Sequence, residues 1–211
     1  GMHEKLQKSA LEVVMTILHA GGKFDHDTYK VSGGLHGVGI SCVNALSQKV
    51  RAEVRREGKV WRQEYERGKP TTAVDAIGES NVTGTIITFW PDPEIFETLE
   101  FKYETLANRL RELSYLNSGL YLNLRDDREL DETGNPKQET FFSEGGLREF
   151  VRFLDESRTP LIDRPIYVKA KEDNVEVEVA MQYNTGYQEH VFSFVNNIST
   201  SDGGKHEAGL K

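Results

Sequence analysis

The sequence contains a single cysteine, and this scarcity limits the kinds of protein it can encode. Cys42 has no partner with which to form an internal disulfide. One cysteine in 211 residues is typical of a reducing compartment, so we expect a cytoplasmic protein. The apolar neighbours of Cys42 predict a buried thiol with a packing role rather than a catalytic one.

Long apolar runs and an excess of positive charge are also lacking. No stretch approaches the roughly 20 apolar residues that span a bilayer, and we therefore expect no membrane partner. The 26 lysines and arginines are outnumbered by 34 aspartates and glutamates, which gives a formal net charge of −8. Because nucleic-acid binding generally requires a basic face, this balance argues against direct DNA binding by the chain.

Glycine, in contrast, is concentrated in one place. The run Gly33-Gly34-Leu35-His36-Gly37-Val38-Gly39 precedes an apolar segment of helical length. Glycine lets the backbone approach a ligand closely, and a helix N-terminus presents free N–H groups with a partial positive charge. The combination predicts an anion site, most often for phosphate. A plain glycine-rich loop before a buried helix is the alternative.

The spacing of these glycines excludes two common phosphate loops. Gly34 and Gly39 have the spacing of a P-loop, but Ile40 occupies the lysine position. A dinucleotide-binding fingerprint would follow a buried strand, whereas residues 25–30 are polar.

Hydrophobic periodicity predicts an α+β chain. Ser9 and Glu12 form a capping-box pattern that opens a helix, with Leu11, Val14, Met15 and Leu18 on its buried face and its end near residue 20. The remaining expected helices are 37–46, 103–113 and 147–154; the expected strands are 50–54, 61–65, 85–90, 120–124, 140–142, 166–170, 175–183 and 191–194, with a charged surface turn over 126–137 and a hairpin turn at 184–186. A change of pattern predicts a domain boundary near residue 161.

The chain resembles the ATP-binding subunits of bacterial type IIA topoisomerases, gyrase B and its topoisomerase IV relative, which belong to the GHKL superfamily. The resemblance covers nearly the whole chain. It is carried by residues 9–15, 19–24, 29–39, 56–59, 83–85, 89–91, 109–117, 144–147 and 194–197. It implies a truncated GHKL (Bergerat) two-layer α/β sandwich over residues 1–160, including the ATP lid. It also implies the first strands of a ribosomal S5 domain 2-like transducer over residues 161–211.

The resemblance also implies a nucleotide site. Backbone amides of the glycine run would wrap the triphosphate, two lysines would supply mobile positive charge, a tyrosine would contact the nucleotide, and a threonine and two isoleucines would line the adenine pocket. These residues are Lys23, Tyr29, Lys30, Gly34, Leu35, His36, Gly37, Val38, Gly39, Ile40, Thr85 and Ile87. Read without the resemblance, the lysines are solvated loop residues and the isoleucines belong to an ordinary core.

Several parts of the family's machinery match no residue of this chain. The general-base glutamate, the Mg²⁺-binding asparagine and the adenine-binding aspartate precede the matched segment, and a phosphate-binding lysine follows it. We therefore expect no catalytic and no metal-binding residue here, weak or absent ATP affinity, and no hydrolysis. The parent enzyme would use ATP and Mg²⁺ for DNA strand passage and supercoiling, with a gyrase A-type subunit and DNA as partners of its other domains.

Two alternatives stay open. A structured piece of this kind could act as a non-catalytic interaction fragment that self-associates through an exposed apolar sheet edge. The chain could also be another GHKL ATPase, such as a chaperone or mismatch-repair protein, because the glycine motif alone is shared across that superfamily.

Overall fold

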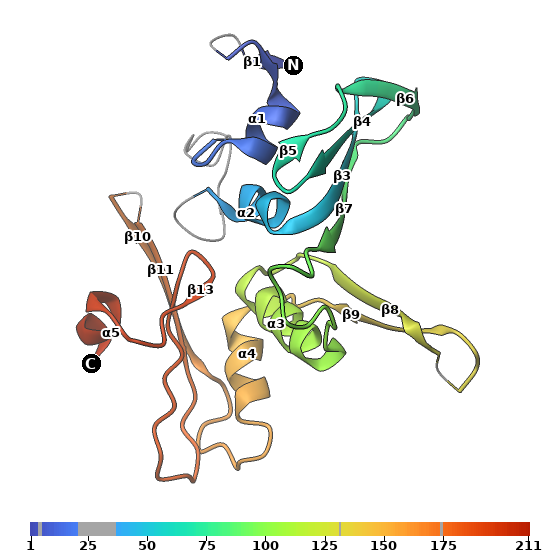
Figure 1. The fold of residues 1–211 in the computed structure, drawn as a ribbon. Coiled ribbons are helices and arrows are strands. Elements are labelled where there is room, and N and C mark those ends of the chain that lie inside the picture. The colour runs from blue at the N-terminus through green and yellow to red at the C-terminus, as the bar shows by residue number, and fades with distance from the viewer. Residues whose placement is uncertain (4–5, 21–36, 131, 174) are drawn as a thin grey trace. The chain divides into compact units, whose positions relative to one another are not determined.

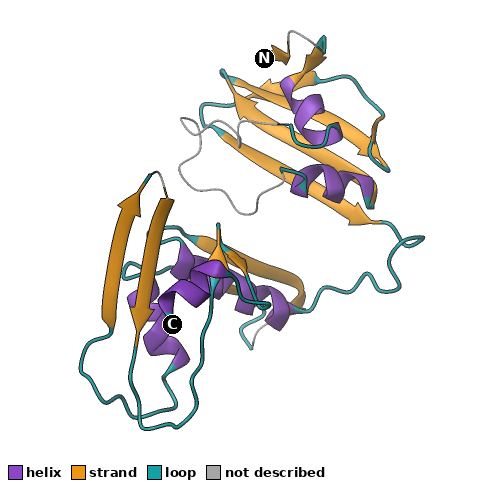
Figure 2. Cartoon of the chain, turned by 90° about the vertical axis from the view of Figure 1, so that its left-hand side faces the viewer, coloured by secondary structure: helices purple, strands orange, loops and turns teal. Residues whose placement is uncertain are grey.

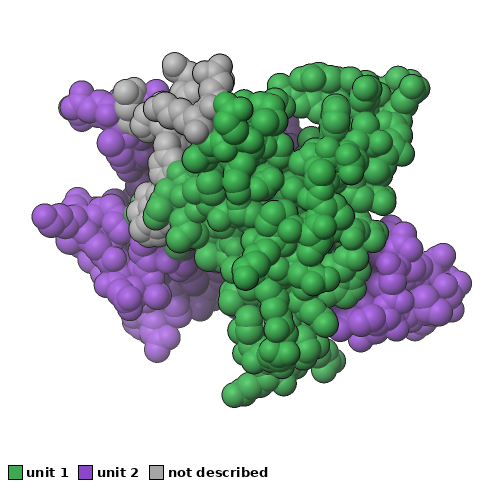
Figure 3. Space-filling model, turned by 45° about the horizontal axis from the view of Figure 1, so that its top comes forward, with its two compact units in different colours: residues 1–100, 194–198 green, residues 101–193, 199–211 purple. Residues whose placement is uncertain are grey.

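The computed structural model describes residues 1–3, 6–20, 37–130, 132–173 and 175–211 (Figure 1). These residues form two compact units. Unit 1 comprises residues 1–100 and 194–198, and unit 2 comprises residues 101–193 and 199–211 (Figure 3). The domain boundary near residue 161 stays a prediction.

Unit 1 is built on an antiparallel sheet with two short helices on one of its faces (Figure 2). Four strands follow the order β5-β4-β3-β7, and β6 also pairs with β4. The elements are β1 (Met2–His3), β2 (Lys8–Ser9), α1 (Ala10–Thr16), α2 (Gly39–Ala45), β3 (Ser47–Arg56), β4 (Lys59–Glu66), β5 (Lys69–Pro70), β6 (Asp75–Glu79) and β7 (Gly84–Pro91).

The hairpin predicted around residues 57–58 is confirmed. Glu57 and Gly58 both have positive φ, as a tight two-residue turn requires, and β3 pairs with β4 on either side of it. Val50 and Ala52 alternate on the inner face of β3 and are buried with Tyr65 of β4. This inner face supplies the core on which the helices pack.

Helix α1 begins as the capping pattern predicts, because the Ser9 hydroxyl accepts a hydrogen bond from the Glu12 amide at 3.0 Å. Two of the four residues predicted for its inner face lie in the core: Met15 is buried, and Leu11 packs against the same cluster. The prediction was wrong about the end of the helix and about Leu18. The helix ends at Thr16, so Leu18 lies beyond it and is 58% exposed, while Val13 is buried in addition.

Helix α2 is shorter than predicted and has a polar inner face. Its buried residues are Ser41 and Asn44, three positions apart on one side of the helix. Cys42 therefore lies on the opposite side and is exposed, which corrects the prediction of a buried thiol.

Unit 2 contains two helices, two antiparallel hairpins and a short C-terminal helix. The elements that follow residue 100 are α3 (Tyr103–Leu116), β8 (Leu122–Leu130), β9 (Pro136–Phe141), α4 (Leu147–Leu154), β10 (Ile166–Glu172), β11 (Val175–Met181), β12 (Phe194–Val195), β13 (Ile198–Ser199) and α5 (Lys205–Leu210). Of these, β12 and the first residue of β13 belong to unit 1. Helix α3 packs its predicted apolar face, centred on Tyr103 and Ala107, against the β8–β9 hairpin through Phe141.

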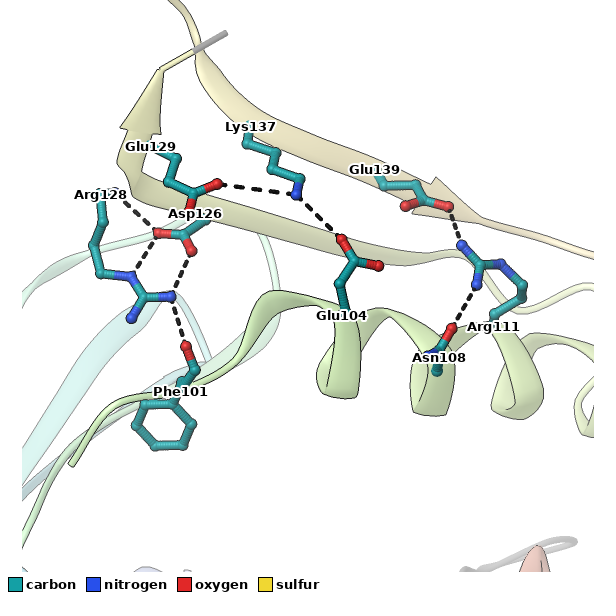
Figure 4. A network of polar contacts seen from close by, with 9 residues as sticks. All are labelled: Phe101, Glu104, Asn108, Arg111, Asp126, Arg128, Glu129, Lys137 and Glu139. Atoms are coloured by element: carbon teal, nitrogen blue, oxygen red, sulfur yellow. Dashed lines mark hydrogen bonds and ion pairs between the residues drawn. The ribbon is translucent and has the colours of Figure 1, made fainter. Parts of the chain in front are cut away.

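The charged tract 126–137, predicted as a surface turn, is mostly strand. β8 continues to Leu130, and Asp126 pairs in register with Lys137 of β9. The Arg128 guanidinium donates hydrogen bonds of 2.9 and 2.6 Å to the Asp126 carboxylate, and it also donates one to the Phe101 carbonyl (Figure 4). Opposite charges facing one another across the ladder allow a charged sequence to extend the hairpin.

The C-terminal third keeps only part of its predicted strand pattern. The β10–β11 hairpin forms as expected, and α4 packs against β11. The third predicted strand begins only at Phe194. The 184–186 turn does not join two strands, because Asn184 instead makes an isolated bridge to Pro160.

Candidate functional site

The candidate site is the N-terminus of α2, where the glycine-rich segment meets the helix. Gly37 has φ of 61°, a left-handed conformation that favours glycine. Val38 occupies the N-cap position, and no side chain in the described ranges caps the helix. Among the described side chains, none therefore occupies the place of an acceptor at the first-turn amides, which is the place of the anion in helix-terminal anion sites.

Gly39 leaves open space at this terminus. The residue is exposed, and a Cβ atom built on it would meet no heavy atom of the described residues within 4 Å. The turn itself is fixed by two bonds to the Val38 carbonyl, one from the Cys42 amide at 2.9 Å and one from the Ser41 hydroxyl at 2.9 Å. The start of the helix is thus well formed, and none of the described residues crowds Gly39.

Ile40 and Ile87 lie at the same hydrophobic core cluster of unit 1. Both pack against the core cluster that contains Met15 and Tyr65, one from α2 and the other from β7. Thr85 lies two residues before Ile87 on β7, on the same face of the sheet, opposite Val54 of β3. These three predicted residues therefore border the side of the sheet that carries α2.

Six of the predicted site residues lie outside the described residues. They are Lys23, Tyr29, Lys30, Gly34, Leu35 and His36. The described part of the site consists of Gly37, Val38, Gly39, Ile40, Thr85 and Ile87, and its use in nucleotide binding stays a prediction.

Two buried polar side chains beside the site were missed by sequence reasoning. Asn44 and Gln63 are almost completely buried, on α2 and β4 respectively. Gln63 could have been found from its position, because it lies between Trp61 and Tyr65 in the inward alternation of β4. Asn44 carried no such signal, since a single asparagine in an apolar helix is compatible with either face.

Glu12 is the acidic side chain on α1, and its surroundings favour the ionised form. Its carboxylate forms an ion pair with the Lys8 ammonium at 2.7 Å. The hydrogen bond from Lys8 lowers the pKa of Glu12, with a smaller contribution from Gln63, against the opposing effect of burial. A carboxylate held in this way is a weak base.

Metal ligands and membrane spans are both absent from the part of the chain that the structure describes. No group of three or more His, Cys, Asp or Glu side chains there is placed to hold a metal ion. Within the same ranges, no helix combines the length and apolar character of a membrane span.

Comparison with known proteins identifies the family. A family model described as DNA gyrase B matches residues 146–211. The DNA gyrase B protein of Clostridium acetobutylicum is 51% identical over 212 residues, covering 100% of this chain and 32% of that protein. The DNA gyrase B protein of Eisenibacter elegans is 58% identical over 187 residues, covering 89% of this chain and 39% of that protein. The chain thus spans about a third of the length of the curated relatives it matches.

The fold agrees with the sequence comparison. The chain is similar to the crystal structure of the 43K ATPase domain of Thermus thermophilus gyrase B in complex with an aminocoumarin, with a TM-score of 0.82 and 36% identity. The match covers 100% of this chain and 52% of that one. The mixed α/β architecture with antiparallel sheets is therefore that of a GHKL-type ATPase domain, and the chain belongs to the DNA gyrase B family.

Proposed function

We propose that the chain is the lid-bearing and early transducer part of the ATPase region of a type IIA topoisomerase. The parent enzyme would couple ATP binding and hydrolysis to DNA strand passage and supercoiling. The observation that carries this proposal is the match of the entire chain to a gyrase B ATPase domain. A gyrase A-type subunit and DNA would be partners of the parent through its other domains, in keeping with the net charge of −8 here.

ATP would be held by the residues around α2. The described residues fit a triphosphate at this place, because Gly39 is open to solvent and no described side chain occupies the cap position. The amides of Gly37, Val38 and Gly39 would donate to the phosphates, while Ile40, Thr85 and Ile87 would form one wall for the adenine. Lys23, Tyr29, Lys30, Gly34, Leu35 and His36 would complete the contact.

The 211-residue chain by itself would bind ATP weakly and would not hydrolyse it. Glu12, the acidic residue of α1, forms an ion pair with Lys8 and lies in the first turn of the helix, where its amide donates to Ser9. General-base catalysis requires a carboxylate within reach of the attacking water with a pKa near the working pH, whereas the surroundings of Glu12 lower its pKa. Mg²⁺ would act in the parent enzyme, where it neutralises phosphate charge.

The test uses backbone amide chemical shifts during titration with a non-hydrolysable ATP analogue. We expect weak, saturable shifts centred on Gly39 and Ile40. Gly39→Ala should abolish them while the protein stays folded, because its Cβ occupies the space left for phosphate and alanine suits a helix. Gly209→Ala in α5, where a Cβ also meets no neighbour, is the matched control and should bind like the wild type. Shifts spread over both units, or phosphate release at the rate of an intact relative, would overturn the proposal.

A second role, non-catalytic self-association, is favoured by one face of the β10–β11 hairpin. Ile166, Val168, Val177 and Met181 alternate onto this face, and all are exposed. An apolar patch of this kind is self-complementary about a two-fold axis. Sedimentation should show a dimer that a Val168→Lys change dissociates, whereas Lys171→Ala on the opposite face should not. A monomer at every concentration would exclude this role.

A further inference from the structure

Helices α1 and α2 are too short to hold their own positions. Each contains seven residues, and isolated helices of this length are unstable in water. Residues 17–38 connect them. The contacts that fix α1 and α2 to their surroundings therefore decide where the amide terminus of α2 lies.

One of these contacts is a buried side-chain bond between the two helices. The Asn44 amide Nδ2 donates a hydrogen bond of 3.0 Å to the Met15 carbonyl. Both residues are at most 1% exposed. Met15 lies in the last turn of α1, where carbonyls lack partners within the helix, and no basic residue is present in that turn. Asn44 thus supplies a donor to the end of the preceding helix.

The same asparagine carries an unpaired acceptor. Its Oδ1 atom is buried and has no hydrogen-bond partner among the described residues. An unpaired buried carbonyl oxygen destabilises a fold, and an apolar residue of similar size would avoid that cost. The asparagine is therefore poorly explained by packing and better explained by its donor.

Helix α1 is itself held in place by a side-chain hydrogen bond to the sheet. Gln63 of β4 donates to the Glu12 carboxylate across 3.5 Å, and the Tyr65 hydroxyl donates to the other end of the Gln63 amide at 2.7 Å. Burial strongly raises the pKa of Tyr65, so its hydroxyl remains a donor. The chain of contacts runs from the sheet through α1 to Asn44.

We propose that Asn44 is a positioning residue that fixes the N-terminal amides of α2 relative to α1 and the sheet. This inference rests on the proposed function for its purpose, since those amides are the ones assigned to the triphosphate. Asn44 itself touches no ligand. Its effect passes through the orientation of α2, which begins at Gly39, five residues before Asn44.

The test compares Asn44→Leu with Asn117→Leu. Asn117 also donates its side-chain amide to a helix carbonyl, that of Leu113, but it does so in unit 2. Hydrogen exchange of backbone amides reports local opening. In Asn44→Leu we expect exchange at Ile17 and Cys42 to rise about fivefold to tenfold, the size of one lost hydrogen bond, with β3 and β4 unchanged. Asn117→Leu should leave both amides as in the wild type.

A second readout separates positioning from general stability. Asn44→Leu should weaken binding of the ATP analogue about fivefold to tenfold with the thermal midpoint nearly unchanged, because it removes the unpaired Oδ1 together with the donor. Unchanged exchange at Ile17 and Cys42, an equal rise throughout the sheet, or local opening with unaltered binding would each overturn the inference.

Different results would refute the proposed function and the positioning role of Asn44. If the wild-type chain binds no analogue, the proposed function is refuted for this chain, and Asn44 is then judged by exchange at Ile17 and Cys42 alone. If Gly39→Ala abolishes binding and Asn44→Leu does not alter it, the function stands and the positioning role falls.

Discussion

A side chain at Gly145 should destabilise the fold, because the space beside this glycine is filled by the Glu149 carboxylate at the start of α4. A Cβ atom there would lie 2.7 Å from Glu149 Oε1 and 2.8 Å from its Cγ. Glu149 accepts hydrogen bonds from the Gly145 amide at 3.0 Å and from the Ser143 hydroxyl at 2.5 Å. Gly145→Ala would push this flexible side chain away, so the main cost is the loss of those bonds.

The magnitude follows from two opposing effects. Losing two bonds of about 1 kcal/mol each destabilises the fold by about 2 kcal/mol. Replacing glycine by alanine restricts the unfolded chain and returns about 0.4–1 kcal/mol, since Gly145 is not in the left-handed region. The net expectation is a loss of about 1–1.5 kcal/mol, measured by urea unfolding and visible as a lower thermal midpoint.

A double-mutant cycle tests the cause as well as the size. In a Glu149→Ala background the carboxylate is already gone, so adding Gly145→Ala should cost nothing or stabilise slightly. Gly209→Ala, at an open helical position, should stabilise the fold by about 0.4–1 kcal/mol. If the full cost of Gly145→Ala persists without the Glu149 carboxylate, the steric account is refuted.

Three further predictions concern the two cores and the β8–β9 hairpin. Hydrogen bonds from Arg128 lower the pKa of Asp126 to about 2. Because this lies below the unfolded value of about 3.9, the associated stability should be present above pH 4 and lost as pH falls through 2, and Asp126→Asn should remove that dependence in acid unfolding curves. Tyr65→Phe should cost about 1–2 kcal/mol in urea unfolding by leaving Gln63 Oε1 without its donor, whereas no loss would contradict the bond. Met15→Ala should cost about 2–5 kcal/mol and Leu18→Ala less than about 0.5, and an equal cost at both positions would contradict the exposure of Leu18.

Elements whose cause is local were predictable from the sequence. The α3 stripe, the α4 stripe and the β3–β4 hairpin each follow from a short hydrophobic period with a defined turn or end. The extension of β8 through charged residues was not, because it depends on Asp126 meeting Lys137 across a ladder. A hydrophobic pattern along the sequence does not indicate which residues will pair across a hairpin, because that pairing depends on the strand register.

The candidate site also contains features that the sequence predicted and features that it did not. The glycine run predicted the place where a helix begins with uncapped amides, and the described residues from Gly37 to Ile40 have that arrangement. Roles for these residues depended on the family resemblance, because Thr85 and Ile87 look like ordinary strand residues in isolation. Neither the residue pattern nor the family resemblance identified Asn44, because its hydrogen bond is made to the Met15 carbonyl, 29 positions away in the sequence.

The polar inner face of α2 connects these observations. Apolar contacts hold a helix against a sheet but allow it to slide, whereas a buried hydrogen bond specifies one register. On α2, Ser41 and Asn44 face inward, and Ser47 just beyond the helix donates to the Val43 carbonyl at 2.6 Å. The serine bonds are local to α2, because Ser41 and Ser47 both donate to carbonyls of that segment. The bond from Asn44 to the Met15 carbonyl joins α2 to another helix, and we therefore expect it to set the position of this seven-residue helix.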